Sequence, residues 1–343
     1  MVKDYKKRLE KLQNRRFDDT LQKSILSESF KKAEFGESLK YALEAMLPID
    51  ESYNKNTYLA SEKIQNNLTN GLAKKNIAVT FRHQGSVETN TNIKLYSDID
   101  LLVITTAFES LEQPQVATNP YKGSVIDTLK ELREESFNSL DAIYNQVDNS
   151  KPKAIQVFPT NPKRKVDVVI ANWFNSNNYK QTGNETFRGI QIYNKETNTR
   201  TSEDFTFLHI SKVNAKDNRV NGGLKKLVRL LKTLKVDADY NIDLTSFEIT
   251  SLLYDISDFR LNKQKREELL LLREASLQLD KLITNTEYRD SLKSPNDKEF
   301  VFKNKSGKVV EFKKLKLELD ELIQDISEEM IKFRKGFDNI IYS

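Results

Sequence analysis

The segment RHQGSVETNTNIKLYSDIDLLVI, from Arg82 to Ile104, ends in a strand-like run that carries two carboxylates, Asp98 and Asp100. Successive side chains of a β-strand point to opposite faces, so the two acids share one face and Ile99 lies on the other. Two like charges this close repel each other unless a cation lies between them. Hard divalent cations prefer carboxylate oxygen ligands. The segment therefore predicts a strand with a divalent-metal site on one face.

A third acid, Asp167, lies in the strand-like run KRKVDVVIAN, where Val166 and Val168 face the other way. An unpaired carboxylate among apolar neighbours is costly, which favours a bound cation there too. Three acids on adjacent strands can hold two magnesium ions, and such a pair orients an in-line displacement at phosphorus. The alternative for the first pair is a turn residue at the strand entry, Asp98, followed by Asp100 on a solvated face.

The dipeptide Gly85-Ser86 follows another strand-like run, and Gln84 directly precedes it. A glycine lets a phosphate approach the backbone closely. The adjacent amide and the Ser86 hydroxyl can donate hydrogen bonds to phosphate oxygens. A plain turn is the alternative. The combination of strand, Gly-Ser, short helix and a strand with two acids favours a phosphate site.

Composition excludes several classes of protein. The 343 residues contain no cysteine, which excludes disulfides, zinc ribbons and thiol catalysis and is typical of a reducing cytosol. The start of the chain lacks the apolar core of a signal peptide, and no run approaches the about 20 apolar residues of a membrane span. The net charge of +5 is too weak to indicate a nucleic-acid binder.

The chain has no repeat, low-complexity tract or flexible linker, and its expected secondary structure differs between two parts. Helices alternate with short Val- and Ile-rich strands up to residue 202, and the rest is mostly helical. We expect helices before Pro48 and over 52–75 and 124–147, strands within 77–86, 96–106, 153–159 and 163–174, and hairpins over 186–202 and 299–312, the last turning at Ser306-Gly307. The predicted division is therefore 1–202 and 203–343.

The stretch GGLKKLVRLLKTLK, residues 222–235, predicts an amphipathic helix that begins after glycines. Four leucines line one side at helical spacing, and a basic ridge follows the other. The alternative for the ridge is an ordinary solvated lysine face. The apolar side comprises Leu224, Leu227, Leu231 and Leu234, and the ridge comprises Lys225, Arg229 and Lys232.

These motifs together resemble the bacterial cGAS/DncV-like nucleotidyltransferases, over roughly residues 50–260. The family pattern joins Gly-Ser to a Thr and an Ile and then to Ser-Asp-x-Asp with an apolar end; Asn90 stands where the family often has glycine. The matching residues here are Gly85, Ser86, Thr91, Ile93, Ser97, Asp98, Asp100 and Val103.

The second half resembles the oligoadenylate synthetases and cyclic GMP-AMP synthase. In their version of the 222–235 helix the last lysine binds the donor triphosphate, a role that falls on Lys232. The later stretch LTSFEITSLL is similar to a segment in which a small polar residue touches phosphate and an aromatic ring stacks on the base. Those positions are Ser246 and Phe247, where the family usually has tyrosine instead of phenylalanine.

The resemblance implies an α+β fold: a DNA polymerase β-like nucleotidyltransferase core with a packed C-terminal helical domain that completes the nucleotide pocket. It implies a template-independent enzyme that joins ribonucleoside triphosphates into a cyclic di- or oligonucleotide second messenger for anti-phage defence. The expected catalytic and metal-binding residues, for two Mg²⁺ ions, are Asp98, Asp100 and Asp167. The expected nucleotide-binding residues are Gln84, Gly85, Ser86, Lys232, Ser246 and Phe247.

The expected substrates are ATP and, alternatively, GTP, UTP or CTP, and the product would reach a separate effector protein. We expect a cytoplasmic monomer without stable binding to nucleic acid or membranes. The alternatives are a linear oligoadenylate-type synthase, a transferase that modifies a small molecule or protein, and a non-enzymatic nucleotide sensor. The presence of all three acids argues against the sensor.

Overall fold

The computed structural model describes residues 3–16, 36–93, 99–264 and 267–342, with the side chains of 53, 333 and 335–342 left aside. The chain divides into two compact units. The helical unit comprises Met1–Ile49, Asn90–Leu95 and Val213–Ser343, and the sheet unit comprises Asp50–Thr89 and Tyr96–Lys212. The predicted division was 1–202 and 203–343. In the structure the first helices belong instead to the helical unit, because they pack on its leucine core.

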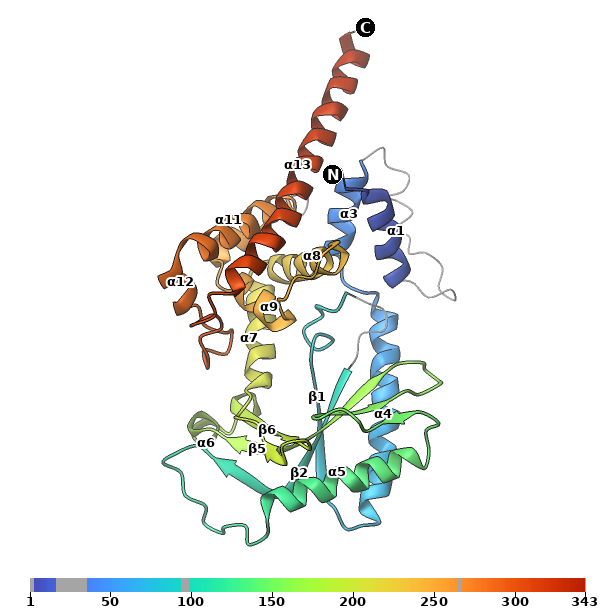
Figure 1. Ribbon diagram of the computed structural model, residues 1–343, viewed down its shortest axis with the longest axis vertical. Coiled ribbons are helices and arrows are strands. Elements are labelled where there is room, and N and C mark those ends of the chain that lie inside the picture. The colour runs from blue at the N-terminus through green and yellow to red at the C-terminus, as the bar shows by residue number, and fades with distance from the viewer. Residues whose placement is uncertain (1–2, 17–35, 94–98, 265–266, 343) are drawn as a thin grey trace. The chain divides into compact units, whose positions relative to one another are not determined.

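A mixed sheet forms the centre of the sheet unit (Figure 1). Its strands run in the order β1-β2-β5-β4-β3, and β6 pairs with β5 and with β7. Only the β2–β5 pair is parallel among these pairings. The strands confirm the predicted β segments, including the 186–202 hairpin, and are β1 (Val79–Gln84), β2 (Ile99–Leu111), β3 (Val147–Asp148), β4 (Ile155–Val157), β5 (Val166–Asn175), β6 (Arg188–Asn194) and β7 (Thr199–Arg200).

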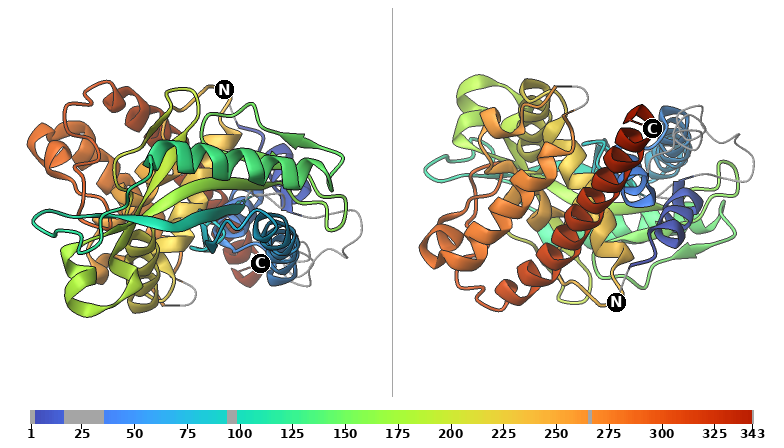
Figure 2. Two further views of the ribbon diagram at one scale, coloured as in Figure 1. Left: turned by 90° about the horizontal axis from the view of Figure 1, so that it is seen from below. Right: turned by 90° about the horizontal axis from the view of Figure 1, so that it is seen from above.

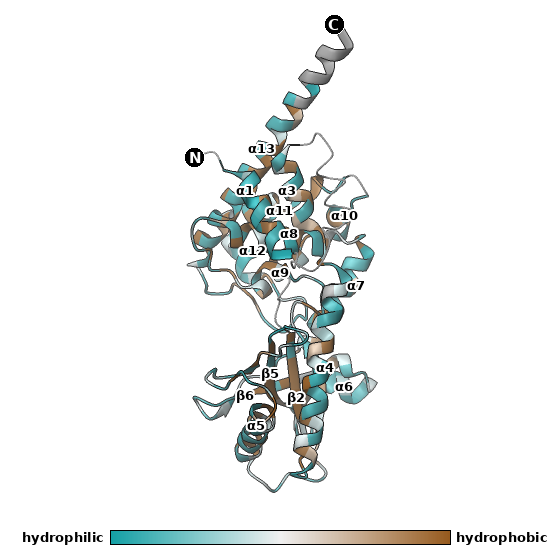
Figure 3. Cartoon of the chain, turned by 90° about the vertical axis from the view of Figure 1, so that its right-hand side faces the viewer, coloured by the Kyte–Doolittle hydropathy of each residue, from teal (hydrophilic) through white to brown (hydrophobic). Residues whose placement is uncertain are grey.

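Two helices, α4 (Glu51–Ala73) and α5 (Val125–Asp141), pack on one face of this sheet, and α5 is seen running along the strands in Figure 2, left. The odd-numbered residues of β2 from Ile99 to Val103 are buried in the cluster that includes residues of both helices. The even-numbered Leu102 and Ile104 are buried in a separate cluster, which also holds Trp173. Figure 3 shows β2 and β5 as largely hydrophobic ribbons. Alternation along a strand thus places Asp100 on the face opposite α4 and α5.

The short helix α6 (Asn177–Thr182) and a 3-10 turn (Glu185–Phe187) complete the sheet unit, and α7 (Thr206–Arg219) runs from this unit into the helical one. Within the described ranges, none of the helices combines the length and apolar character needed to cross a membrane.

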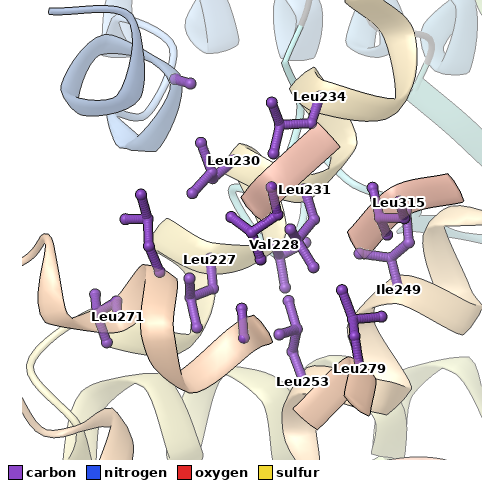
Figure 4. Close-up of a cluster of buried hydrophobic side chains, with 14 of the residues drawn as sticks. Leu227, Val228, Leu230, Leu231, Leu234, Ile249, Leu253, Leu271, Leu279 and Leu315 are labelled. Atoms are coloured by element: carbon purple, nitrogen blue, oxygen red, sulfur yellow. The ribbon is translucent and has the colours of Figure 1, made fainter. Parts of the chain in front are cut away.

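The helical unit is built around α8 (Gly223–Asp237). The four predicted leucines of α8 are all fully buried, which confirms its apolar side. Figure 4 shows three of them, Leu227, Leu231 and Leu234, in one cluster with residues such as Ile249, Leu279 and Leu315. The other helices among the described residues of the unit are α1 (Tyr5–Arg16), α3 (Glu37–Met46), α9 (Ser246–Tyr254), α10 (Asp258–Leu261), α11 (Leu270–Thr284), α12 (Thr286–Ser291) and α13 (Lys308–Tyr342).

Two local predictions are wrong. The hairpin expected over 299–312 is absent, because α13 begins at Lys308 and buries Phe312, Leu315 and Leu319 at helical spacing. The Val-Val pair favoured a strand, but burial on the core outweighs local propensity. The short helix expected after Gly85-Ser86 is also absent, since residues 86–90 form turns.

Candidate active site

Strand register brings two of the three predicted acids together. The parallel β2–β5 pairing sets Asp100 opposite Asp167. The neighbouring pairings set Gln84 opposite Asp100 and Gln156 opposite Asp167. We call these four residues, Gln84, Asp100, Asp167 and Gln156, the polar row. The row crosses β1, β2, β5 and β4 on the face that α4 and α5 leave uncovered.

Each carboxylate of the polar row accepts a hydrogen bond from a glutamine amide. Gln84 Nε2 donates to Asp100 Oδ2 at 3.3 Å, and Gln156 Nε2 donates to Asp167 Oδ1 at 3.2 Å. Lys165 Nζ lies 3.4 Å from the same Asp167 oxygen. Sequence reasoning missed Gln156, although its place between Ile155 and Val157 in a short strand already indicated a polar residue facing away from the core.

The third predicted acid, Asp98, and its neighbour Ser97 lie outside the described residues. Among the described residues, no group of three or more His, Asp or Glu side chains could hold a metal ion. The structure therefore places Asp100 and Asp167 and leaves the complete triad a prediction.

The polar row has the chemistry that a divalent cation requires. Two adjacent carboxylates supply hard oxygen donors. The Gln84 Oε1 atom beside them is buried, and no described residue donates a hydrogen bond to it. An acceptor of this kind is costly unless a donor reaches it, and the water shell of a magnesium ion supplies such donors. The residues present thus fit a hydrated divalent metal.

The turn after β1 requires glycine at its first position. Gly85 has a φ of +96°, which L-residues rarely adopt, and a β-carbon there would lie 3.4 Å from Asp100 Oδ2. Ser86 follows in a turn in which Thr89 Oγ1 donates to the Ser86 carbonyl at 3.3 Å. His83 has a structural role, because its ring lies 2.9 Å from the Ser61 hydroxyl and burial lowers its pKa.

The basic ridge of α8 differs from a solvated lysine face. Arg229 is only 5% exposed and Lys232 only 8% exposed. Arg229 donates to the carbonyls of Met46 and Asn90, each at 2.7 Å, and Lys232 Nζ donates to the carbonyl of Thr91 at 2.7 Å. The solvated alternative is therefore wrong for these two residues.

Burial and like charge act together on this pair. Desolvation, with a smaller contribution from the neighbouring Arg229 charge, lowers the pKa of Lys232 to about 8. Desolvation likewise lowers the pKa of Arg229 to about 10. The segment that they bind begins with Asn90 at a φ of +51°, the left-handed region in which asparagine best replaces glycine. Asn90 thus adopts a conformation that most other residues rarely adopt.

The remaining two predicted residues begin α9. Thr245 caps this helix together with Glu248, whose side chain accepts from the Thr245 backbone amide at 2.8 Å. Ser246 is exposed in the first turn, and Phe247 is half-buried against the core of the helical unit. Because α8 packs on α9, Lys232 and these two residues belong to one compact unit.

Comparisons with known proteins identify the family of the chain. Residues 211–324 match the model of the cGAS/DncV-like nucleotidyltransferase C-terminal helical domain. The chain is 32% identical, over 92% of each chain, to a c-di-GMP synthase of Flavobacteriaceae sp. genome_bin_11. It is also 32% identical to the cyclic dinucleotide synthase CdnE of Yersinia aleksiciae, over 94% of this chain and 86% of the relative.

Solved structures show the same fold. The STING-associated CdnE c-di-GMP synthase from Flavobacteriaceae sp. superposes with a TM-score of 0.83 at 30% identity, over 95% of this chain and 99% of that one. The corresponding synthase from Capnocytophaga granulosa gives a TM-score of 0.80 at 33% identity, with the same coverage. With its α+β architecture and its C-terminal helical domain, the chain belongs to the cGAS/DncV-like nucleotidyltransferases.

Proposed function

We propose that this nucleotidyltransferase joins two molecules of GTP into c-di-GMP and releases two pyrophosphates. The observation that carries the reaction class is the polar row, in which strand register holds Asp100 beside Asp167. The choice of guanine rests on relatives that are c-di-GMP synthases and cover most of this chain. A separate effector protein then responds to the product, as the STING association of a similar synthase suggests.

Each of the two steps has the same balance. A ribose hydroxyl oxygen of the acceptor forms a bond to the α-phosphorus of the donor. The bond from that phosphorus to the bridging oxygen of the β-phosphate breaks, and pyrophosphate leaves. The hydroxyl proton passes to Asp167 or to a water molecule. After the first step the linear intermediate must bind again in a new orientation before the ring closes.

The sheet unit would bind the reacting groups. Two magnesium ions held by Asp98, Asp100 and Asp167 would neutralise phosphate charge and lower the pKa of the attacking hydroxyl. The Gly85-Ser86 turn would bind phosphate oxygens through its amide and its hydroxyl. Gln84 would accept a hydrogen bond at its buried oxygen.

The helical unit would bind the donor nucleotide. Lys232 would contact the triphosphate, the Ser246 hydroxyl would donate to a phosphate oxygen, and the ring of Phe247 would stack on a base. Support comes from the motif resemblance and from the burial of Lys232, since a buried cation binds an anion more strongly than a solvated one.

The test is mass spectrometry of the products formed from a mixture of the four ribonucleoside triphosphates with magnesium. We expect c-di-GMP that survives a nuclease unable to cleave rings. A different cyclic dinucleotide would overturn the base choice but keep the reaction class. Linear products would favour an oligoadenylate-type synthase, and the absence of any product would favour a sensor.

A further inference from the structure

Gln156 is a polar residue of the sheet that the proposed reaction does not use. It is the middle residue of the three-residue strand β4. Its backbone pairs with Asp148 of β3 on one side and with Asp167 of β5 on the other. Ile155 and Val157 on either side are fully buried. The main chain at Gln156 is therefore held by a paired strand on each side and by two buried neighbours in β4, which fixes the position from which its side chain extends.

The contact that this side chain makes is chemically specific. Gln156 donates to Asp167 Oδ1, the same oxygen that lies 3.4 Å from Lys165 Nζ. The two donors differ in charge. A lysine cation neutralises the carboxylate and competes with a metal ion, whereas an amide donates a hydrogen bond and leaves the negative charge available. Lys165 lies 3.4 Å from this oxygen, whereas the Gln156 amide nitrogen lies 3.2 Å from it.

We propose that Gln156 is a positioning residue for Asp167: its amide fixes the orientation of the carboxylate that takes part in metal binding. This inference rests on the proposed function, because it assigns Asp167 to the metal site. Gln84 has the matching geometry on the other edge, donating to Asp100. The row thus places a neutral amide donor beside each acid, and at Asp167 this amide acts in addition to the Lys165 cation. Residues that orient metal ligands in this way typically contribute about 10- to 100-fold to metal affinity or activity.

The experiment compares the parent chain with Gln156→Leu, which keeps the bulk and removes the donor, and with Gln156→Glu, which keeps the shape and faces Asp167 with a second charge. The matched control is Gln146→Leu, since Gln146 is exposed in the segment before β3. Binding of Mn²⁺ is measured by electron paramagnetic resonance, alone and with a non-hydrolysable GTP analogue. Thermal midpoints report folding, and initial rates report turnover.

We expect Gln156→Leu to weaken Mn²⁺ binding by about 10- to 100-fold and to lower kcat while the KM for GTP changes little. High Mn²⁺ should restore part of the lost rate. Gln156→Glu should keep its fold and show altered Mn²⁺ binding, and Gln146→Leu should match the parent. If folded Gln156→Leu and Gln156→Glu both bind Mn²⁺ like the parent, the inference is overturned. Because the Mn²⁺ titration requires no product, a parent chain without synthase activity would overturn the proposed function instead.

Discussion

The polar row of the sheet unit and the buried cations of α8 both bring like charges together. The charges are negative in the row and positive in the helix. In the row, strand register places Asp100 beside Asp167, and neutral amides donate to both acids. In the helical unit, Arg229 and Lys232 lie one turn apart, and neutral carbonyls accept from both cations. These neutral dipoles stabilise charge without cancelling it, although Asp167 also lies 3.4 Å from the Lys165 ammonium group. The two regions differ in solvent access: Asp100 and Asp167 are half-buried, whereas Arg229 and Lys232 are buried.

The largest expected effect comes from removing charge in the polar row. Asp100→Asn and Asp167→Asn should each abolish product formation, because a neutral amide binds magnesium weakly. Stability should be unchanged or higher, since repulsion between the two carboxylates is relieved. Product assays and thermal midpoints of both variants check this. Turnover that survives in either variant would contradict the metal role of that acid.

Asp98→Asn extends the same test to the predicted third acid. The loss of product should match that of Asp100→Asn if the two acids share an ion. Parent-like turnover would remove Asp98 from the site and leave Asp100 and Asp167 as the metal-binding pair.

The second effect comes from removing charge in the helical unit. Lys232→Ala should raise the KM for triphosphates by about 10- to 150-fold, since a charge-assisted phosphate contact contributes about 1.5–3 kcal/mol. The control is Lys225→Ala, because Lys225 lies 3.8 Å from Asp217 and so already has an acidic partner. If Lys225→Ala raises the KM for triphosphates strongly while Lys232→Ala matches the parent, the phosphate contact has been assigned to the wrong lysine.

The sequence predicted well both the strands that carry the polar row and the helix α8 that carries Arg229 and Lys232, for different reasons. Alternation along β2 fixes which face Asp100 occupies, and the leucine spacing of α8 fixes its buried side. The sequence did not predict that Lys232 is buried, because that depends on a loop from the distant residues 90–93. It also missed Gln156, since pairing of β4 with β5 is a property of the folded sheet. The false hairpin at 299–312 has the same origin, a local pattern outweighed by packing.

A smaller effect is expected at Phe247. Stacking on a base contributes about 1–3 kcal/mol and tolerates base identity. Phe247→Leu should weaken binding of all triphosphates by a similar factor, near the lower end of that range because the ring already packs partly on the core. Phe247→Tyr should be near neutral. Melting temperatures and GTP affinities check both variants, and a loss of stability without a loss of affinity would remove Phe247 from the site.

The last expected effect is a pH dependence. Burial lowers the pKa of Lys232 from 10.5 to about 8, so between these values the folded protein has lost a proton that the unfolded chain keeps. Across that window this group makes folding more favourable as pH rises. Its charge for binding phosphate is lost over the same window. The kcat/KM of the parent relative to Lys232→Arg should therefore fall up to about tenfold per pH unit above 8.

The arginine variant serves as the reference because its side chain stays charged throughout this range. Both proteins share any titration of the acids and of the attacking hydroxyl, so the ratio isolates Lys232. A ratio that stays flat from pH 7 to 10 would show that Lys232 does not bind the free triphosphate.

The parallel pairing of β2 with β5 also restricts which insertions and deletions strand β2 can accept. An insertion of one residue between Asp100 and Thr105 would rotate the acid onto the face packed by α4 and α5. An insertion of two would restore its face and displace it along the strand. Between Thr105 and Glu109 the pairing with β5 already contains a register shift, so the sheet accommodates an irregularity there. Changes of length should therefore be tolerated in the outer half of β2 and excluded, when odd, from its inner half.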